Sequence, residues 1–176
     1  ARVQLQYEPA VSLEDGLALF ASDDLLGVGA MANWVKEQKT SAYATFVVNR
    51  QINPTNICVL SCRFCDYATK EGNPRAYRMS TEDILSKCNS DLREVHIVSG
   101  LYRGWRFDDY LDVVRVIKEN FPQIQIKAYT AVEIDFFARR ERVPIKTILE
   151  RMKEAGVVCI PGGGAEVFSE RVRKAL

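Results

Sequence analysis

The sequence predicts an α/β fold, namely part of a TIM-like βα barrel with parallel strands and an N-terminal helical cap. Three observations predict this fold class. Short apolar segments alternate with amphipathic ones after about residue 51, and strands separated by helices form right-handed βαβ units on a parallel sheet. Helical patterns precede that alternation. Loops rich in glycine, serine or cysteine follow the expected strands.

The first expected elements are helices, within residues 12–40. Ser12 is a favourable N-cap residue, and apolar residues recur after it at helical spacing, namely Leu13, Leu17 and Phe20. A second helix is expected at 28–36. Residues 41–52 are rich in aromatic and β-branched residues and have strand character. We therefore expect a first domain, residues 1–50, that forms a helical cap with an entry strand.

The second expected domain, residues 51–176, holds the first four βα units of the barrel. Its first strand, 52–57, leads into a loop that contains three cysteines. A sequence that resembles a capping box, from Ser80 to Asp83, opens a short helix. The next strand, 95–98, is apolar enough to be buried.

The remaining elements continue the alternation. Residues 107–120 form an amphipathic helical pattern with apolar residues on one face. A strand at 124–129, a helix at 144–154 and a strand at 157–160 follow, and the chain is helical again from Phe168. Ligands of such barrels collect at the carboxyl ends of the strands. We therefore expect the functional residues in the loops that follow the strands.

Three cysteines, Cys58, Cys62 and Cys65, follow the first strand with the spacing C-x3-C-x2-C. Three thiolates this close can bind one face of a [4Fe–4S] cluster, and such clusters normally take four thiolates. One iron is then left open for a small molecule. The spacing therefore predicts a cluster-binding loop with a ligand site on the open iron.

Two other uses of these cysteines compete with the cluster. A structural zinc site takes four ligands, usually as two pairs, whereas the one histidine, His96, lies far along the chain and fits a satisfied core residue. Five cysteines, an odd number, do not suggest a disulfide framework. A non-catalytic zinc-binding or iron–sulfur module is the alternative of another class.

Composition limits the possible partners. The chain is 47% hydrophobic and 27% charged, which is typical of a globular protein. A net charge of +1 gives no indication of nucleic acid or of an anionic membrane as partner. No apolar run is long enough for a transmembrane helix, and we expect no signal peptide. Cysteines that hold a metal must stay reduced, so we expect a cytoplasmic protein.

The cysteine spacing resembles that of the radical S-adenosylmethionine (SAM) superfamily. The resemblance implies that the open iron binds the amino and carboxylate groups of SAM, and that an electron from the cluster cleaves SAM to methionine and a 5′-deoxyadenosyl radical. It also implies SAM contacts near Tyr67, just after the third cysteine, and at the turn formed by Ser99 and Gly100. Ordinary packing of Tyr67 and a plain strand-to-helix turn are the alternatives.

Acidic residues follow two later strands. Three glycines, 162–164, leave room for a ligand beside the backbone, and Glu166 can accept hydrogen bonds from ribose hydroxyls or an ammonium. Its alternative role is to favour the dipole of the next helix. Thr130 and Glu133 follow the third strand and are candidate catalytic residues that contact substrate or position another side chain. For Glu133 the alternative is a solvated glutamate at a helix start.

Longer segments resemble the aminofutalosine synthases of the futalosine route to menaquinone, namely Asn53–Cys58, His96–Leu101, Lys127–Ile134 and Pro161–Phe168. The resemblance implies that the adenosyl radical adds to 3-[(1-carboxyvinyl)oxy]benzoate, an aromatic dicarboxylate, to form 6-amino-6-deoxyfutalosine. It also implies an external electron donor such as flavodoxin or ferredoxin. Dehypoxanthine futalosine cyclase and FO-synthase-like enzymes are the alternatives within the superfamily.

The chain departs from the aminofutalosine synthases in three respects. Residues 99–103 read Ser-Gly-Leu-Tyr-Arg where that family commonly has Gly-Gly-Leu-His-Pro. Cys159 stands where serine is usual. The later strands that the family implies, the C-terminal half of the barrel, are absent from the 176 residues.

Overall fold

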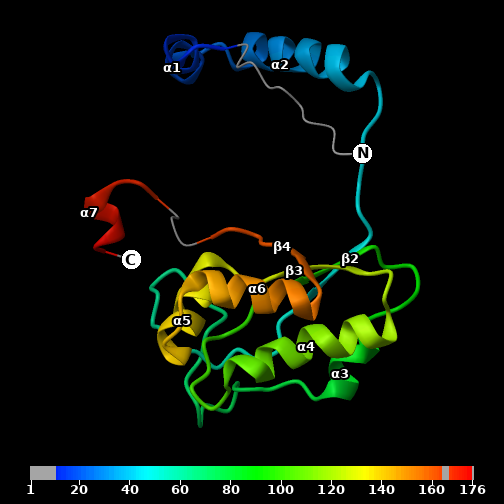
Figure 1. Ribbon diagram of the computed structural model, residues 1–176. Coiled ribbons are helices and arrows are strands. Elements are labelled where there is room, and N and C mark those ends of the chain that lie inside the picture. Colours follow the sequence, from blue (N-terminus) through cyan, green and yellow to red (C-terminus); the bar gives the residue numbers. More distant parts are fainter. Residues whose placement is uncertain (1–10, 164–166, 176) are drawn as a thin grey trace. The chain divides into compact units, whose positions relative to one another are not determined.

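The computed structural model of the protein describes residues 11–163 and 167–175 (Figure 1). The chain divides into two compact units, Ala1–Phe46 and Val47–Leu176. The second unit contains the sheet and all five cysteines. It therefore holds every group that the sequence singles out for chemistry.

The first unit contains two helices, α1 (Leu13–Ala21) and α2 (Leu25–Thr40). Ser12 caps α1 in a capping box with Asp15, which agrees with its position before the apolar repeat. Asp24 accepts a hydrogen bond of 2.8 Å from the Gly27 N–H. Because this bond caps the helix, α2 begins earlier than the expected range of 28–36.

The second unit is built on one four-stranded sheet, in which each neighbouring pair of strands is parallel and the order is β1-β2-β3-β4. Its strands are β1 (Asn49–Ile52), β2 (Glu94–Ile97), β3 (Gln125–Ala128) and β4 (Val157–Cys159). Its helices are α3 (Thr81–Ser86), α4 (Phe107–Asn120), α5 (Ala131–Glu141), α6 (Ile145–Ala155) and α7 (Glu170–Arg173). Parallel strands that alternate with helices confirm the predicted α/β class.

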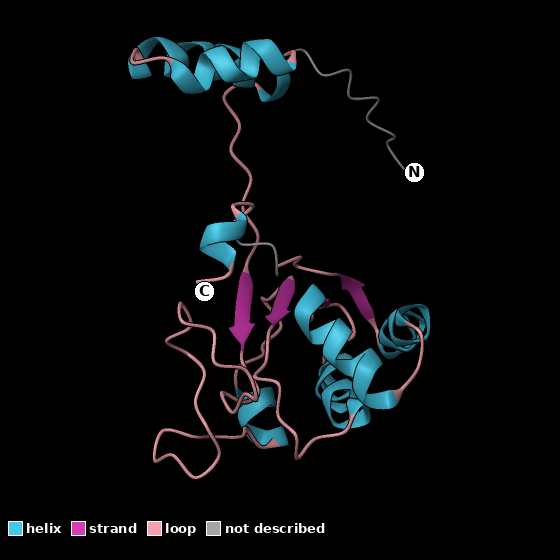
Figure 2. Ribbon diagram, turned by 90° about the vertical axis from the view of Figure 1, so that its left-hand side faces the viewer, coloured by secondary structure: helices cyan, strands magenta, loops and turns pink. Residues whose placement is uncertain are grey.

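Helices α4 and α6 cover one face of this sheet (Figures 1 and 2). The side chains of β2 alternate, so that Val95 and Ile97 are buried whereas Glu94 and His96 are partly exposed on the other face. The apolar stripe of α4 enters the same core through Tyr110, Leu111, Val114 and Ile117. Because the strands are parallel, their carboxyl ends and the loops that follow them share one edge of the sheet.

The expected strands at 41–52 and 52–57 are wrong except over β1. Pro54 has no N–H to donate to a ladder, and the sheet pairing ends before it. The segment after it makes two isolated bridges instead, Thr55 with Arg78 and Ile57 with Thr69. The chain between β1 and the cysteines is therefore held by its own loop and not by the sheet.

One helix, α5, is not predicted by the sequence analysis, which assigns its first residues to a loop. Thr130 caps α5, and the Glu133 side chain completes the capping box. Apolar residues at helical spacing along α5 are buried in the core, namely Ile134, Phe137 and Ala138. The loop after β3 is consequently short, and it carries Thr130 directly to the edge where the strands end.

Candidate metal centre

The three clustered cysteines line one small cavity at the carboxyl ends of the strands. Cys58, Cys62 and Cys65 are each partly buried there, and the cavity has a volume of about 110 Å³. The loops after β2 and β3 contribute Ser99, Thr130 and Glu133 to the same wall. Residues far apart in the sequence therefore meet around the thiols.

The base of the cysteine loop is closed by backbone hydrogen bonds. The Cys58 N–H donates to the Thr69 carbonyl oxygen at 2.9 Å, and the Thr69 N–H donates to the Asn56 carbonyl oxygen at 2.9 Å. The Val59 N–H donates to the Leu101 carbonyl oxygen at 2.9 Å, which joins the loop to the turn after β2. These bonds fix both ends of the segment that carries the thiols.

The turn after β2 approaches the cysteine loop very closely. The Gly100 N–H donates to the Thr55 carbonyl oxygen at 2.8 Å. A Cβ atom at residue 100 would overlap the carbonyl oxygen of Ile57 and lie 2.8 Å from its carbonyl carbon. Glycine is required here because the obstructing atoms are backbone.

Ser99 presents an unused polar atom to the cavity. Its side chain is buried, and its Oγ has no hydrogen-bond partner among the residues that the structure describes. A buried polar atom without a partner is costly unless a ligand or water satisfies it. Ser99 thus fits a site that holds a polar ligand beside the cysteines.

Glu133 connects the loops after β2 and β3. Its Oε1 accepts a hydrogen bond from the Ser99 N–H at 2.7 Å, and its Oε2 accepts from the N–H and the hydroxyl of Thr130, each at 2.7 Å. The residue is only 2% exposed, so the alternative of a solvated glutamate is wrong. Burial raises its pKa to about 7, against the opposing effect of the hydrogen bonds from Thr130 and Ser99.

The triple-glycine loop also reaches Thr130. Gly162 and Gly163 both have positive φ, at 84° and 90°, and the Ala131 N–H donates to the Gly162 carbonyl oxygen at 3.2 Å. A Cβ at residue 163 would lie 3.3 Å from Cγ2 of Thr130. The last residue expected in this loop, Glu166, lies outside the described residues.

Tyr67 is held by another tyrosine and does not line the cysteine cavity. Its hydroxyl lies 2.6 Å from that of Tyr77, which in turn donates to the Asn53 carbonyl oxygen at 3.0 Å. Burial, followed by the hydrogen bond with Tyr77, raises the pKa of Tyr67. Its ring packs edge-on against Tyr77, as the packing alternative predicts.

The sequence analysis missed the apolar wall of the cavity, and it misjudged His96, which lies outside that wall. Leu60, Val98, Leu101 and Val132 line the cavity, and no motif distinguishes them from ordinary core residues. His96 is not the satisfied core residue expected, because its buried Nε2 has no partner within the described chain. Burial, and then Lys127, lower its pKa.

The donor set around the cavity fits a [4Fe–4S] cluster. Three thiols line one cavity, and in such a cluster each thiolate binds a different iron. In residues 11–163 and 167–175, no group of three His, Cys, Asp or Glu side chains is placed to hold a single metal ion.

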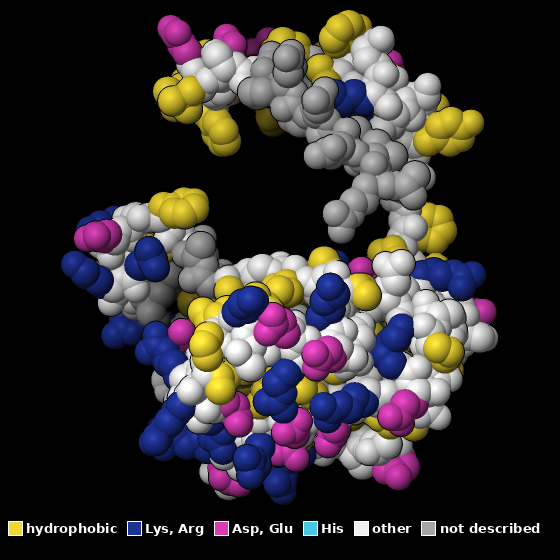
Figure 3. Space-filling view, viewed as in Figure 1, with side chains coloured by type: hydrophobic (Ala, Val, Ile, Leu, Met, Phe, Trp, Pro, Cys, Tyr) yellow, Lys and Arg dark blue, Asp and Glu magenta, His cyan; other side chains and the backbone are white. Residues whose placement is uncertain are grey.

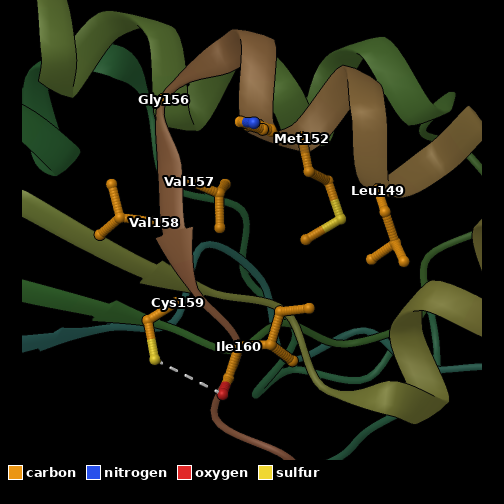
Figure 4. Close-up of a pocket in the computed structure, with 8 residues that line it drawn as sticks. Leu149, Met152, Gly156, Val157, Val158, Cys159 and Ile160 are labelled. Carbon is orange, nitrogen blue, oxygen red and sulfur yellow. Dashed lines mark hydrogen bonds between the residues drawn. The ribbon is translucent and has the colours of Figure 1, made fainter. Parts of the chain in front are cut away.

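A larger cavity of the second unit lies elsewhere, between α6 and β4. It has a volume of about 670 Å³ and is mainly apolar, with Leu149, Met152, Val158 and Ile160 in its wall (Figure 4). Cys159 is also part of it, and its Sγ lies 3.7 Å from the Ile160 carbonyl oxygen. This cavity lacks the convergent polar groups of the cysteine site. Its larger volume therefore does not make it the candidate site of the reaction.

The surface of the second unit has mixed charge. Figure 3 shows Lys and Arg interspersed with Asp and Glu over the face in view, in keeping with the net charge of +1. Among the described residues, no helix has the length and apolar character needed to span a membrane.

Residues 52–176 match the Radical SAM superfamily. The chain is 38% identical to aminodeoxyfutalosine synthase of Thermus thermophilus, over 94% of this chain and 46% of that protein. It is 37% identical to the Streptomyces coelicolor enzyme of the same name, over 93% and 43%. It is 32% identical to cyclic dehypoxanthine futalosine synthase of Halalkalibacterium halodurans, over 93% and 45%. The chain thus spans about half the length of these relatives.

A solved structure has a similar fold. Methylornithine synthase (PylB) superposes with a TM-score of 0.59 over 90% of this chain and 56% of that one, at 15% sequence identity. At that identity the likeness establishes the fold alone. Together with the four parallel strands, it confirms the prediction of a partial TIM-like βα barrel.

Proposed function

Since this chain belongs to the radical SAM superfamily, we propose that Cys58, Cys62 and Cys65 hold a [4Fe–4S] cluster whose open iron binds SAM. When bound, the cluster supplies the electron that cleaves SAM to methionine and a 5′-deoxyadenosyl radical. The observation that carries the proposal is the convergence of the loops after β2 and β3 on the cysteine cavity. A reactive radical needs a site that excludes water, and apolar side chains such as Leu60, Val98 and Leu101 line this cavity.

In this proposal the residues around the cavity orient SAM and its partner. The unpartnered Ser99 Oγ is available to hold a polar group of SAM. At Gly100 the N–H and the carbonyl oxygen already bond to Thr55 and Tyr110, so its part in the proposal is to let the turn approach the cysteine loop closely. Thr130 and Glu133 fix the loops that face the substrate, and both Glu133 oxygens are already occupied by protein donors. Glu133 therefore acts by positioning. Contacts of SAM with Tyr67 and Glu166 remain part of the proposal.

We further propose that the protein is a transferase of the aminofutalosine synthase type. The adenosyl radical adds to the vinyl carbon of 3-[(1-carboxyvinyl)oxy]benzoate. Rearrangement onto the arene, decarboxylation, and transfer of one electron back to the oxidised iron–sulfur centre would then give 6-amino-6-deoxyfutalosine. The similarity to two aminodeoxyfutalosine synthases supports this reading. An external donor such as flavodoxin or ferredoxin, and a cytoplasmic location, belong to the same proposal.

Cysteine substitutions test the cluster first. After anaerobic reconstitution, the protein should hold about four iron and four sulfide per chain. Cys58→Ala should lose most of the iron and the visible absorbance. Cys88→Ala and Cys159→Ala are matched controls, because neither thiol lines the cysteine cavity, and both should keep full iron content. Unchanged iron in Cys58→Ala would contradict the assignment.

Product analysis tests the reaction. Protein with full cluster content is incubated anaerobically with SAM, dithionite and the enolpyruvyl benzoate, and the nucleosides are read by mass spectrometry. The product should contain the whole adenosyl group, because radical addition retains it. Free 5′-deoxyadenosine with unchanged benzoate would instead favour a hydrogen-abstracting relative, such as the cyclic dehypoxanthine futalosine synthase to which the chain is also similar.

A further inference from the structure

The ammonium of Lys70 binds three successive carbonyl oxygens at the start of the cysteine loop. Its Nζ donates to the carbonyl oxygens of Cys58, Val59 and Leu60 at 3.0, 3.1 and 2.6 Å. A lysine ammonium has three donors and no acceptor. All three donors are therefore used on one short backbone segment, which includes the first of the clustered cysteines.

The neighbouring backbone fixes the place from which Lys70 reaches this segment. Thr69, the preceding residue, pairs with the chain on both sides of Ile57, through its N–H to Asn56 and its carbonyl oxygen to the Cys58 N–H. Consecutive carbonyl oxygens that point to one side repel each other unless a cation lies between them. The ammonium thus stabilises a curved backbone at the point where the Cys58 thiol enters the cavity.

The charge of Lys70 is not neutralised by a carboxylate. Within the described residues it forms no salt bridge, and the adjacent Glu71 accepts a hydrogen bond from the Tyr102 hydroxyl at 2.6 Å. Lys70 lines a second cavity, of about 330 Å³, which shares Cys58 and Leu101 with the cysteine cavity. The positive charge of Lys70 therefore lies beside the Cys58 backbone without a salt bridge to a carboxylate among the described residues.

We propose that Lys70 is a positioning residue for the cluster, which fixes the Cys58–Leu60 backbone and favours the reduced state by its charge. This inference rests on the proposed function. A cluster held by three thiolates is negative, and one added electron makes it more so. A nearby cation therefore stabilises the reduced form more than the oxidised form and raises the potential. Lys70 touches neither SAM nor substrate in this role.

Two substitutions separate geometry from charge. Lys70→Met removes both, whereas Lys70→Arg keeps the charge on a planar group that cannot match three carbonyl oxygens in the same way. Lys87→Met is the matched control, because Lys87 is an exposed lysine in another part of the unit. The first measurement is hydrogen exchange of the Cys58 and Val59 amides in the protein without metal. The second is a redox titration of the reconstituted cluster followed by electron paramagnetic resonance.

We expect Lys70→Met and Lys70→Arg to speed exchange at both amides about tenfold, with no change in Lys87→Met. The potential should fall in Lys70→Met by about 59 mV, a tenfold shift of a one-electron equilibrium, and should stay near that of the parent protein in Lys70→Arg.

Three results would overturn parts of this inference. Unchanged exchange in Lys70→Met would exclude the positioning role. An unchanged potential in Lys70→Met, or an equal fall in Lys70→Arg, would exclude the role of charge. If the parent protein takes up no iron, the proposed function fails, and the role of charge fails with it, while exchange in the metal-free protein still decides the positioning role. If only Lys70→Met fails to hold iron, hydrogen exchange in the metal-free variants tests the positioning role, and the reduction potential of Lys70→Arg tests the role of charge.

Discussion

At the scale of single residues, Glu133 shows two opposing effects on one carboxyl group. Three donors, from Ser99 and Thr130, favour its ionised form, whereas almost complete burial favours the neutral form. Burial is the larger effect, because the pKa rises from 4.5 to about 7. A group that lies between two functional loops is therefore near its point of titration at physiological pH.

Glu133 should make the protein less stable as the pH rises. The pKa of Glu133 is higher in the folded chain than in the unfolded chain. The stabilisation that this group contributes is therefore complete below about pH 4.5 and is lost as the pH rises through about 7. The free energy of unfolding should change by about 3 kcal/mol across this range from this group. Glu133→Gln should remove that slope in urea denaturation, although glutamine loses one acceptor oxygen and lowers stability overall.

The surface glutamate Glu119 provides the control for this pH dependence. Glu119 is exposed at the end of α4, so Glu119→Gln should leave the slope of stability against pH as it is in the parent protein. Equal slopes in Glu133→Gln and the parent protein would show that Glu133 titrates alike in the folded and unfolded chains. The burial of Glu133 would then not make the free energy of unfolding depend on pH.

The clustered cysteines could be predicted from the sequence because the signal is local. Cys58, Cys62 and Cys65 lie within one short loop, so spacing alone places all three beside one cavity. The pairing of Tyr67 with Tyr77, and the burial of Glu133 under Ser99, depend on contacts between segments far apart in the chain. Neither pattern nor propensity contains that information.

At the scale of elements, the turn after β2 is joined to the cysteine loop through Gly100. Gly100→Ala should force the two backbones apart, because the new Cβ meets Ile57 and Asn56 backbone atoms and not a side chain that can move. The hydrogen bond from Gly100 to Thr55 would weaken as well. We expect a loss of about 1–3 kcal/mol in the free energy of unfolding, together with reduced iron uptake.

A helical glycine provides the contrast to Gly100. Gly29 lies within α2, and a Cβ there would meet no atom within 4 Å beyond its own helix. Gly29→Ala should therefore not destabilise the protein, because alanine favours a helix over glycine. Chemical denaturation and iron analysis of both variants measure these effects. Equal stability of Gly100→Ala and the parent protein would contradict the close approach of the two backbones.

Most elements could be predicted because their periodicity is strong, and the failures have identifiable causes. Helix α4 occupies the predicted range, and β2 to β4 lie within one or two residues of theirs. Helix α5 has both a capping box at Thr130 and a buried apolar face, so the signal was present but short. The strand expected at 52–57 does not form because Pro54 lies within it, and propensity alone does not show where pairing stops.

At the scale of the whole second unit, the sheet is covered on one face and has two edge strands. In the described part of the chain β1 pairs with β2 alone and β4 with β3 alone, but the exposed residues of β1 are polar or charged whereas those of β4 include an apolar one. Val158 on β4 is 63% exposed, and the apolar cavity of Figure 4 lies beside it. A parallel sheet is normally buried on both faces, and an open apolar edge is a template for pairing with another chain.

The 176-residue chain should therefore associate with itself through β4. Val158→Lys places a charge on the exposed edge, where pairing with a second copy would have to bury it, so the association constant should fall at least about tenfold. Sedimentation equilibrium over a range of concentrations measures it. Gln38→Lys adds the same charge on α2, at an exposed position, and should leave association unchanged. If both variants weaken association equally, net repulsion explains the effect and the edge does not. If neither does, the apolar edge is not where copies meet.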